Sequence, residues 1–165
     1  DYFTASNPAE FSPSGTLMLV FKANNAISAF DSIYAVQGGA RNFQIDSNVV
    51  SNGEFHGRVN SNAHTGLEKV TSSGNDWMIL AYRWDAVSSV ASLWTNGVKD
   101  DEVTDYVNAY SPNPSAVVIA ANRNLDRPLD CDVGQIWRFD AALSDFDLGK
   151  MFTYAGSRWG IALDI

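Results

Sequence analysis

The sequence has little of the chemistry that many metalloenzymes and nucleic-acid-binding proteins need. It has one cysteine, two histidines, and 11 lysines and arginines against 19 aspartates and glutamates. One cysteine excludes an internal disulfide, and together with two histidines it forms no recognisable ligand set for zinc or iron. The formal charge of -8, with no run of Lys or Arg, disfavours nucleic acid and anionic membrane surfaces as partners.

Long hydrophobic runs are also missing. The longest, such as residues 17–21 and 116–121, fall far short of the roughly 20 apolar residues that a membrane span needs. We therefore predict no membrane insertion. A chain of 165 residues with 45% hydrophobic residues is enough for one domain with its own core. We expect a single domain over residues 1–165, and the start at Asp1 without Met suggests a piece of a longer polypeptide or of a larger assembly.

Helical periodicity is scarce, whereas short stretches rich in β-branched and aromatic residues recur between turn signals such as Asn96-Gly97. The predicted strands are residues 16–22, 32–37, 42–46, 54–59, 67–70, 77–84, 90–95, 116–121, 132–139 and 160–163. Several are apolar at successive positions, which indicates that both of their faces are covered. The pattern predicts an all-β fold, a two-sheet antiparallel β-sandwich. The acidic residues 100–102 are expected in a solvated loop.

One short helix is predicted near the C-terminus. Ser144 is a suitable N-cap, and Gly156 is expected to end the helix. Phe146, Met151 and Tyr154 can share its inward face, so that the helix would close one end of the sandwich.

Five segments, in order, carry a resemblance to a known superfamily. They are WMILAYRWD (77–85), ASLWTNG (91–97), VIAAN (118–122), LDCDVGQI (129–136) and ALSD (142–145). Together they resemble the concanavalin A-like lectin/glucanase superfamily, above all its laminin-G-like and pentraxin-like jelly rolls, over residues 16–160. The resemblance implies a jelly roll with Trp77, Leu93 and Ile136 in the core. Function stays open, because this superfamily includes glycan-binding modules, glycan-cleaving enzymes, adhesion domains and virion surface proteins.

The residues that its enzymes use are not in place. Retaining glucanases need two carboxyls about 5 Å apart, but the four glutamates are widely separated: Glu10, Glu54, Glu68 and Glu102. In the Gln-Ile-His strand of the jelly-roll lyases, this chain has Asp46 in place of the histidine. We predict a protein that is not an enzyme. The alternative is a divergent polysaccharide lyase or glycoside hydrolase, with His56 as base and Arg58 holding a uronate carboxylate.

The segment 122–132 raises the question of a metal. The resemblance implies a calcium site at a sandwich rim, and the candidate ligands are Asn124, Asp126, Asp130 and Asp132. Arginines interleaved with these acids favour local charge pairing instead. Cys131 alternates with Asp130 and Asp132 and should face the core. Its acidic neighbours should raise the pKa of the thiol.

Exposed aromatics are the usual platforms for sugar rings, and core packing is the competing interpretation for each of them. The candidate carbohydrate-binding residues are Tyr82, Trp84, Trp94, Arg58 and His56. We predict a non-catalytic, lectin-like recognition or assembly domain. It would bind glycan, or a capsid or fibre protein, at a virion surface (as a capsid decoration, fibre or tail component) or outside a cell, and homo-oligomer formation is left open.

Overall fold

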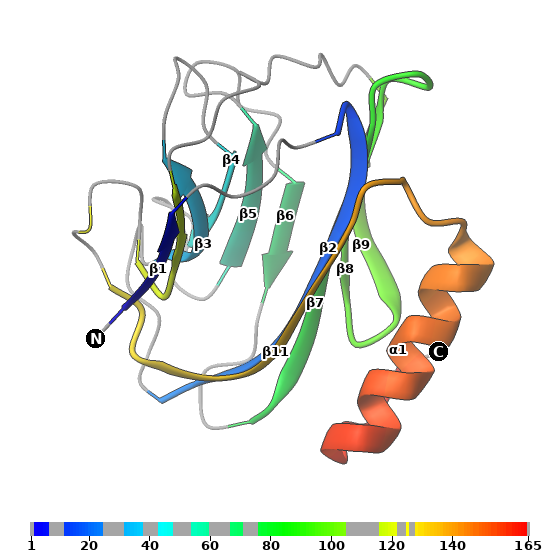
Figure 1. The fold of residues 1–165 in the computed structure, drawn as a ribbon. Helices are drawn as coiled ribbons and strands as arrows, with labels where there is room; N and C mark the ends of the chain where they lie inside the picture. The colour runs from blue at the N-terminus through cyan, green and yellow to red at the C-terminus, as the bar shows by residue number, and fades with distance from the viewer. Residues whose placement is uncertain are drawn as a thin grey trace.

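The computed structural model describes residues 2–6, 12–24, 32–37, 43–47, 54–59, 67–70, 76–104, 116–121, 125 and 128–164. Two antiparallel sheets face each other, and one helix lies beside the second sheet (Figure 1). The first sheet has the order β1 (Phe3–Ser6), β10 (Ala116–Ile119), β3 (Ser32–Gln37), β4 (Phe43–Ser47), β5 (Glu54–Val59) and β6 (Leu67–Val70). The second has the order β11 (Cys131–Phe139), β2 (Ser14–Ala23), β7 (Met78–Asp85), β8 (Val90–Thr95) and β9 (Val98–Val103). The predicted two-sheet sandwich is confirmed.

The predicted strands are confirmed with three differences. Residues 161–164 are not a strand but an irregular segment that follows the helix. β1 was not among the predicted strands. The acidic residues 100–102 belong to β9, an edge strand, so the prediction of a loop there is wrong. Charged side chains are common on edge strands because they prevent pairing with another chain.

The central strand β2 explains why successive apolar residues occur in one strand. Leu17, Leu19 and Phe21 pack in the core between the two sheets. Met18 and Val20 point to the other face, where they pack in a second cluster with residues of the helix. Both faces of β2 are therefore covered, by the opposite sheet on one side and by the helix on the other.

The helix α1 (Asp145–Trp159) begins as predicted and ends later than predicted. Ser144 is its N-cap, with Oγ accepting a hydrogen bond from the backbone N–H of Asp147 at 3.1 Å. Gly156 is an interior residue, and Gly160 ends the helix in the left-handed conformation, with φ of 66°. The helix ends there because Gly160 adopts a positive φ without steric cost.

The predicted inward face of α1 is confirmed for Met151, which packs against the second cluster, but is wrong for Phe146 and Tyr154. Leu148, Phe152 and Ala155 are buried, whereas Phe146 and Tyr154 are 72% and 49% exposed. The helix packs along the outer face of the second sheet and does not close an end of the sandwich (Figure 1). No helix among the described residues has the length and apolar character of a membrane span.

Candidate functional site

Two of the predicted sugar-binding aromatics lie in the protein interior. Tyr82 and Trp84 are 0% and 3% exposed, and their rings stack on each other with centroids 5.8 Å apart. Their strand, β7, places them on the face that meets the opposite sheet. A ring without an exposed face cannot stack on a sugar, so the structure corrects the prediction for Tyr82 and Trp84.

Trp94 has a different environment. It lies on β8 and packs at the edge of the cluster between the second sheet and α1. Its indole Nε1 donates a hydrogen bond to Ser92 Oγ at 2.9 Å, which fixes the ring orientation. Trp94 remains partly exposed and lines a groove between α1 and the β8–β9 hairpin.

We call this groove the Trp94 groove. Its volume is about 650 Å³, and its lining residues are Trp94, Gly97, Asp145, Phe146, Gly149, Lys150, Thr153 and Tyr154. The six helical members form three pairs of neighbours that repeat every four residues, so they share one face of α1. Two of them, Phe146 and Tyr154, are among the exposed large hydrophobic residues of the described chain. The groove thus brings three aromatic rings together from two distant parts of the sequence.

Gly149 keeps the helical side of this groove open. A glycine inside a helix costs roughly 0.5–1 kcal/mol relative to alanine. Close packing does not require it here, because a Cβ added to Gly149 would meet no atom within 4 Å. The helix therefore gives up stability at a position where any larger side chain would enter the groove.

Cationic groups lie against the aromatic rings. Arg83 Cζ and Lys99 Nζ are 5.5 and 5.8 Å from the centroid of the Trp94 ring, and Lys150 Nζ is 3.9 Å from that of Phe146. Most of their charge is balanced locally: Lys99 Nζ pairs with Glu102 at 2.9 Å, and Arg83 pairs with Asp145. The groove therefore combines apolar ring faces with polar groups and has little net charge.

The other predicted carbohydrate-binding residues lie elsewhere in the fold. His56 and Arg58 belong to β5 in the first sheet, paired in register with Asp46 and Gln44 of β4, and their side chains lie outside the described residues. Trp94 belongs to the second sheet. The structure therefore does not bring the five predicted residues together in one site.

Trp94 is the groove residue that the sequence predicted, and Phe146, Gly149 and Tyr154 are among those that the prediction missed. Phe146 and Tyr154 were assigned to the core. The sequence signal that could have located this face of the helix is a glycine in mid-helix, three residues after one aromatic residue and five before another.

The candidate metal ligands are only partly described. Asn124 and Asp126 lie outside the described residues. Asp132 pairs with Lys22 Nζ at 3.0 Å, and Asn24 Nδ2 donates to Asp130 at 3.3 Å and to Asp132 at 3.4 Å. The hydrogen bonds from Lys22 and Asn24 lower the pKa of Asp132. Among the described residues no group of three or more metal-ligating side chains is present. Asp132 is therefore charge-paired, and its partner is Lys22 rather than one of the neighbouring arginines that the sequence suggested.

Cys131 packs against the core between the sheets, as the alternation predicted. Burial, with added repulsion from Asp130 and Asp132, raises the pKa of the thiol to about 11. A thiol with such a pKa is protonated and unreactive at neutral pH.

The fold can be compared with known proteins. No protein-family model matches the chain, and no curated protein matches it in sequence. Several solved structures match in fold. The CBM40 module of the Ruminococcus gnavus IT-sialidase has 15% identity and a TM-score of 0.69, with 84% of this chain and 82% of that chain covered. A heptameric SAP-like pentraxin from Limulus polyphemus has 13% identity and a TM-score of 0.64, with coverages of 92% and 82%.

A structure of botulinum neurotoxin type C also matches, with 10% identity, a TM-score of 0.74 and 93% of this chain covered. Its description says that cell entry of this toxin depends on interaction with two ganglioside molecules. The chain spans only 36% to 39% of the botulinum neurotoxin chains that it matches. At such identities the likeness establishes the fold. The chain has the concanavalin A-like jelly-roll fold, as the sequence resemblance implied.

Proposed function

We propose that this domain is a non-catalytic, lectin-like recognition module that binds glycan through the Trp94 groove, outside a cell or on a virion surface as part of a decoration, fibre or tail. The observation that carries the proposal is the convergence of Trp94, Phe146 and Tyr154 around a groove kept open by Gly149. Binding sites of this kind combine apolar and aromatic walls with a few placed polar groups. The matching folds give context, since one was solved with sialyllactose and another is described with gangliosides.

The polar groups of the groove suit hydroxyl recognition. The C–H face of a sugar ring would cover the exposed faces of Phe146 and Tyr154. Asp145, Lys150 and Thr153 would then offer acceptors and donors to the hydroxyls around the ring.

The composition of the groove favours binding over catalysis. Hydrolysis of a glycoside in most families needs two carboxyl groups, one on either side of the bond. Among the residues that the structure describes, Asp145 is the one carboxylate that lines the Trp94 groove. A lyase centred on His56 of β5 is the enzymatic alternative. Depolymerisation of alginate or of a β-glucan that disappears in His56→Ala would establish that alternative in place of this proposal.

A protein partner is the second candidate for the groove, and the 72% exposure of Phe146 favours it. An apolar ring so exposed also suits a contact with a capsid or fibre protein, or with a second copy of the chain. Sedimentation and glycan arrays separate these candidates: self-association that is lost in Phe146→Ser, with no glycan bound, would favour the assembly role.

The direct test is a glycan array probed with the wild-type domain and two groove variants. Phe146→Ala removes one wall, and Gly149→Gln places a side chain in the opening while retaining good helix propensity. We expect each variant to lose about tenfold in affinity, corresponding to about 1.4 kcal/mol. Val87→Ala is the matched control, because Val87 is 92% exposed and does not line the groove. Equal binding by all four proteins would contradict the proposal.

A further inference from the structure

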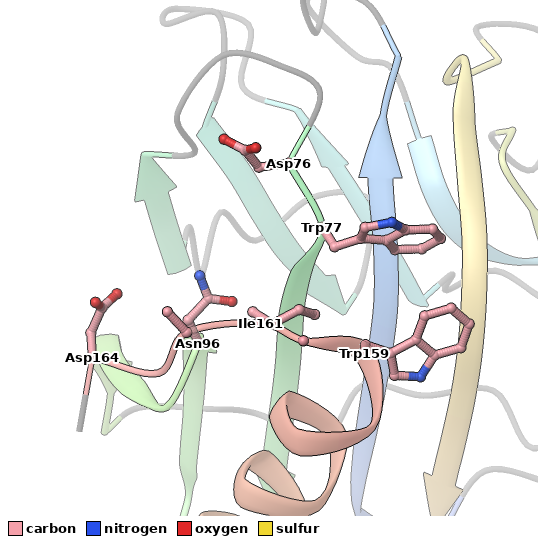
Figure 2. A pocket seen from close by; sticks show the side chains of 8 residues that line it. Asp76, Trp77, Asn96, Trp159, Ile161 and Asp164 are labelled. Atoms are coloured by element: carbon pink, nitrogen blue, oxygen red, sulfur yellow. The ribbon is translucent and has the colours of Figure 1, made fainter.

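A second pocket lies on the other side of the Asn96-Gly97 turn and shares no lining residue with the Trp94 groove. We call it the Trp77 pocket. Its volume is about 440 Å³. Three separate segments form it: the residues before β7, the turn after β8, and the segment after α1. In Figure 2, Asp76, Asn96 and Asp164 lie on one side of Ile161, and the indoles of Trp77 and Trp159 lie on the other.

Asn96 organises the polar side of this pocket. Its backbone N–H donates to Ile79 O, and its Oδ1 accepts from Ile79 N–H, both at 2.9 Å. Its backbone carbonyl accepts from Asp164 N–H at 3.1 Å, which ties the C-terminal segment to the turn. Because Oδ1 is already used, the side chain presents Nδ2 as a donor, and this group has no hydrogen bond to another described residue.

The aromatic side is held rigidly. The ring centroids of Trp77 and Trp159 are 5.0 Å apart, with an interplanar angle of 37°. Trp159 also lies directly on β11, since a Cβ added to Gly134 would come within 2.8 Å of its ring. Trp77 therefore packs as the resemblance implied, yet part of it lines the pocket. A wall fixed before binding loses little conformational entropy when a ligand arrives.

The charged residues that line the pocket are Asp76 and Asp164. Lys22 Nζ lies 5.8 Å from the centroid of the Trp77 ring, but its charge is paired with Asp132 at 3.0 Å. Asp76 and Asp164 are exposed carboxylates that form no ion pair with another described residue. A sugar hydroxyl can both donate and accept, so neighbouring hydroxyls can donate to the two carboxylates and accept from Asn96 Nδ2. A ligand with its own carboxylate would be repelled by both aspartates.

We propose that the Trp77 pocket is a second glycan-binding site, specific for a neutral pyranose and selective against uronic and sialic acids. The ligand class rests on the proposed lectin-like function, but the pocket and its residues are independent of the Trp94 groove. Carboxylates and Asn96 Nδ2 bind the hydroxyls, and the fixed indole pair limits the orientation of the ring.

The test uses titrations with the methyl glycosides of glucose, galactose, mannose and N-acetylglucosamine, and with methyl glucuronide and galacturonide. Binding is followed by tryptophan fluorescence and by ligand-observed NMR. We expect at least one neutral glycoside to bind at millimolar concentration, and both uronides to bind about tenfold more weakly than that glycoside. Uronide binding as strong as that of the neutral sugar, or no binding of any neutral glycoside, would overturn the proposal.

Two variants assign the binding to this pocket. Asp164→Asn removes one carboxylate and keeps the backbone hydrogen bond to Asn96. Asn96→Asp keeps the acceptor for Ile79 N–H, tolerates the positive φ of 48° and removes the Nδ2 donor. Loss of one such hydrogen bond should weaken neutral-sugar binding by about tenfold. Unchanged affinity in both variants would also overturn the proposal.

The groove variant Phe146→Ala separates the two sites. Val87 is exposed and lines neither pocket, so Val87→Ala should leave binding of the neutral methyl glycoside unchanged. If Phe146→Ala loses glycan-array binding while Asp164→Asn and Asn96→Asp change nothing, the Trp94 groove stands and the Trp77 pocket does not. If only the pocket variants lose binding, the Trp77 pocket stands and the Trp94 groove does not.

Discussion

The two interior glycines of α1, Gly149 and Gly156, should respond differently to substitution by alanine. Gly149 lies on the exposed face toward the Trp94 groove, and a Cβ there would meet no atom within 4 Å. Gly156 is buried, and a Cβ there would lie 3.0 Å from Ile161 O and 3.1 Å from the side chain of Leu163. The helix geometry is the same at both positions, so the comparison isolates tertiary packing.

The magnitudes follow from helix propensity and packing. Gly149→Ala should stabilise the domain by roughly 0.5–1 kcal/mol, because alanine loses less backbone entropy in a helix. For a domain of this size, that gain raises Tm by about 1–4 °C. Gly156→Ala has the same helical gain but must displace the segment after the helix, which costs typically 1–3 kcal/mol. We expect its Tm to stay level or fall.

Thermal melts followed by circular dichroism measure both variants, and urea denaturation checks that the m-value is unchanged. The double variant should show the sum of the two effects. A fall in Tm for Gly149→Ala would refute the open environment assigned to that residue. An equal rise in both variants would show that residues 161–163 move freely away from the helix, and this would remove the fixed frame of the Trp77 pocket.

Three further predictions concern other parts of the molecule. Ser144→Ala should lose about 1 kcal/mol of stability in urea denaturation, because it removes the N-cap hydrogen bond of α1, whereas Ser144→Asp should retain most of it. Cys131 should react slowly with a thiol reagent at neutral pH and quickly in denaturant, since its thiol pKa is raised to about 11 in the fold; fast labelling of the native protein would contradict its burial. Calcium or a chelator should leave Tm unchanged, because Lys22 and Asn24 already contact Asp132. A calcium-dependent rise would instead indicate that Asn124 and Asp126 complete a site.

The strands were predictable because their signals are local. The Asn96-Gly97 dipeptide forms a tight turn with both residues at positive φ, and it joins β8 to β9 as such pairs commonly do. Ser144 began the helix as predicted, because an N-cap depends on a hydrogen bond three residues away. β9 escaped prediction because Asp and Glu have low strand propensity, and its position at a sheet edge is a property of the whole fold.

The candidate sites were less predictable, because exposure depends on what packs against each residue. Alternation correctly placed Tyr82 and Trp84 on one face of β7, but it could not say that this face meets the other sheet. The Trp77 pocket joins residues near positions 76, 96 and 164, and no local pattern connects them.

The sequence by itself determined that the chain is a two-sheet β-sandwich, where its helix begins and that its one cysteine faces the core. Apolar periodicity, turn chemistry and charge act over a few residues, so these features can be read in order along the chain. Only the tertiary structure decided which arc of α1 faces inward. The helix has apolar residues on two arcs, and the outer face of β2 and β7 buries Leu148 and Phe152 and leaves Phe146 and Tyr154 in the groove. Which arc of α1 is buried depends partly on β2, which lies more than a hundred positions before the helix in the sequence. No local pattern contains that information.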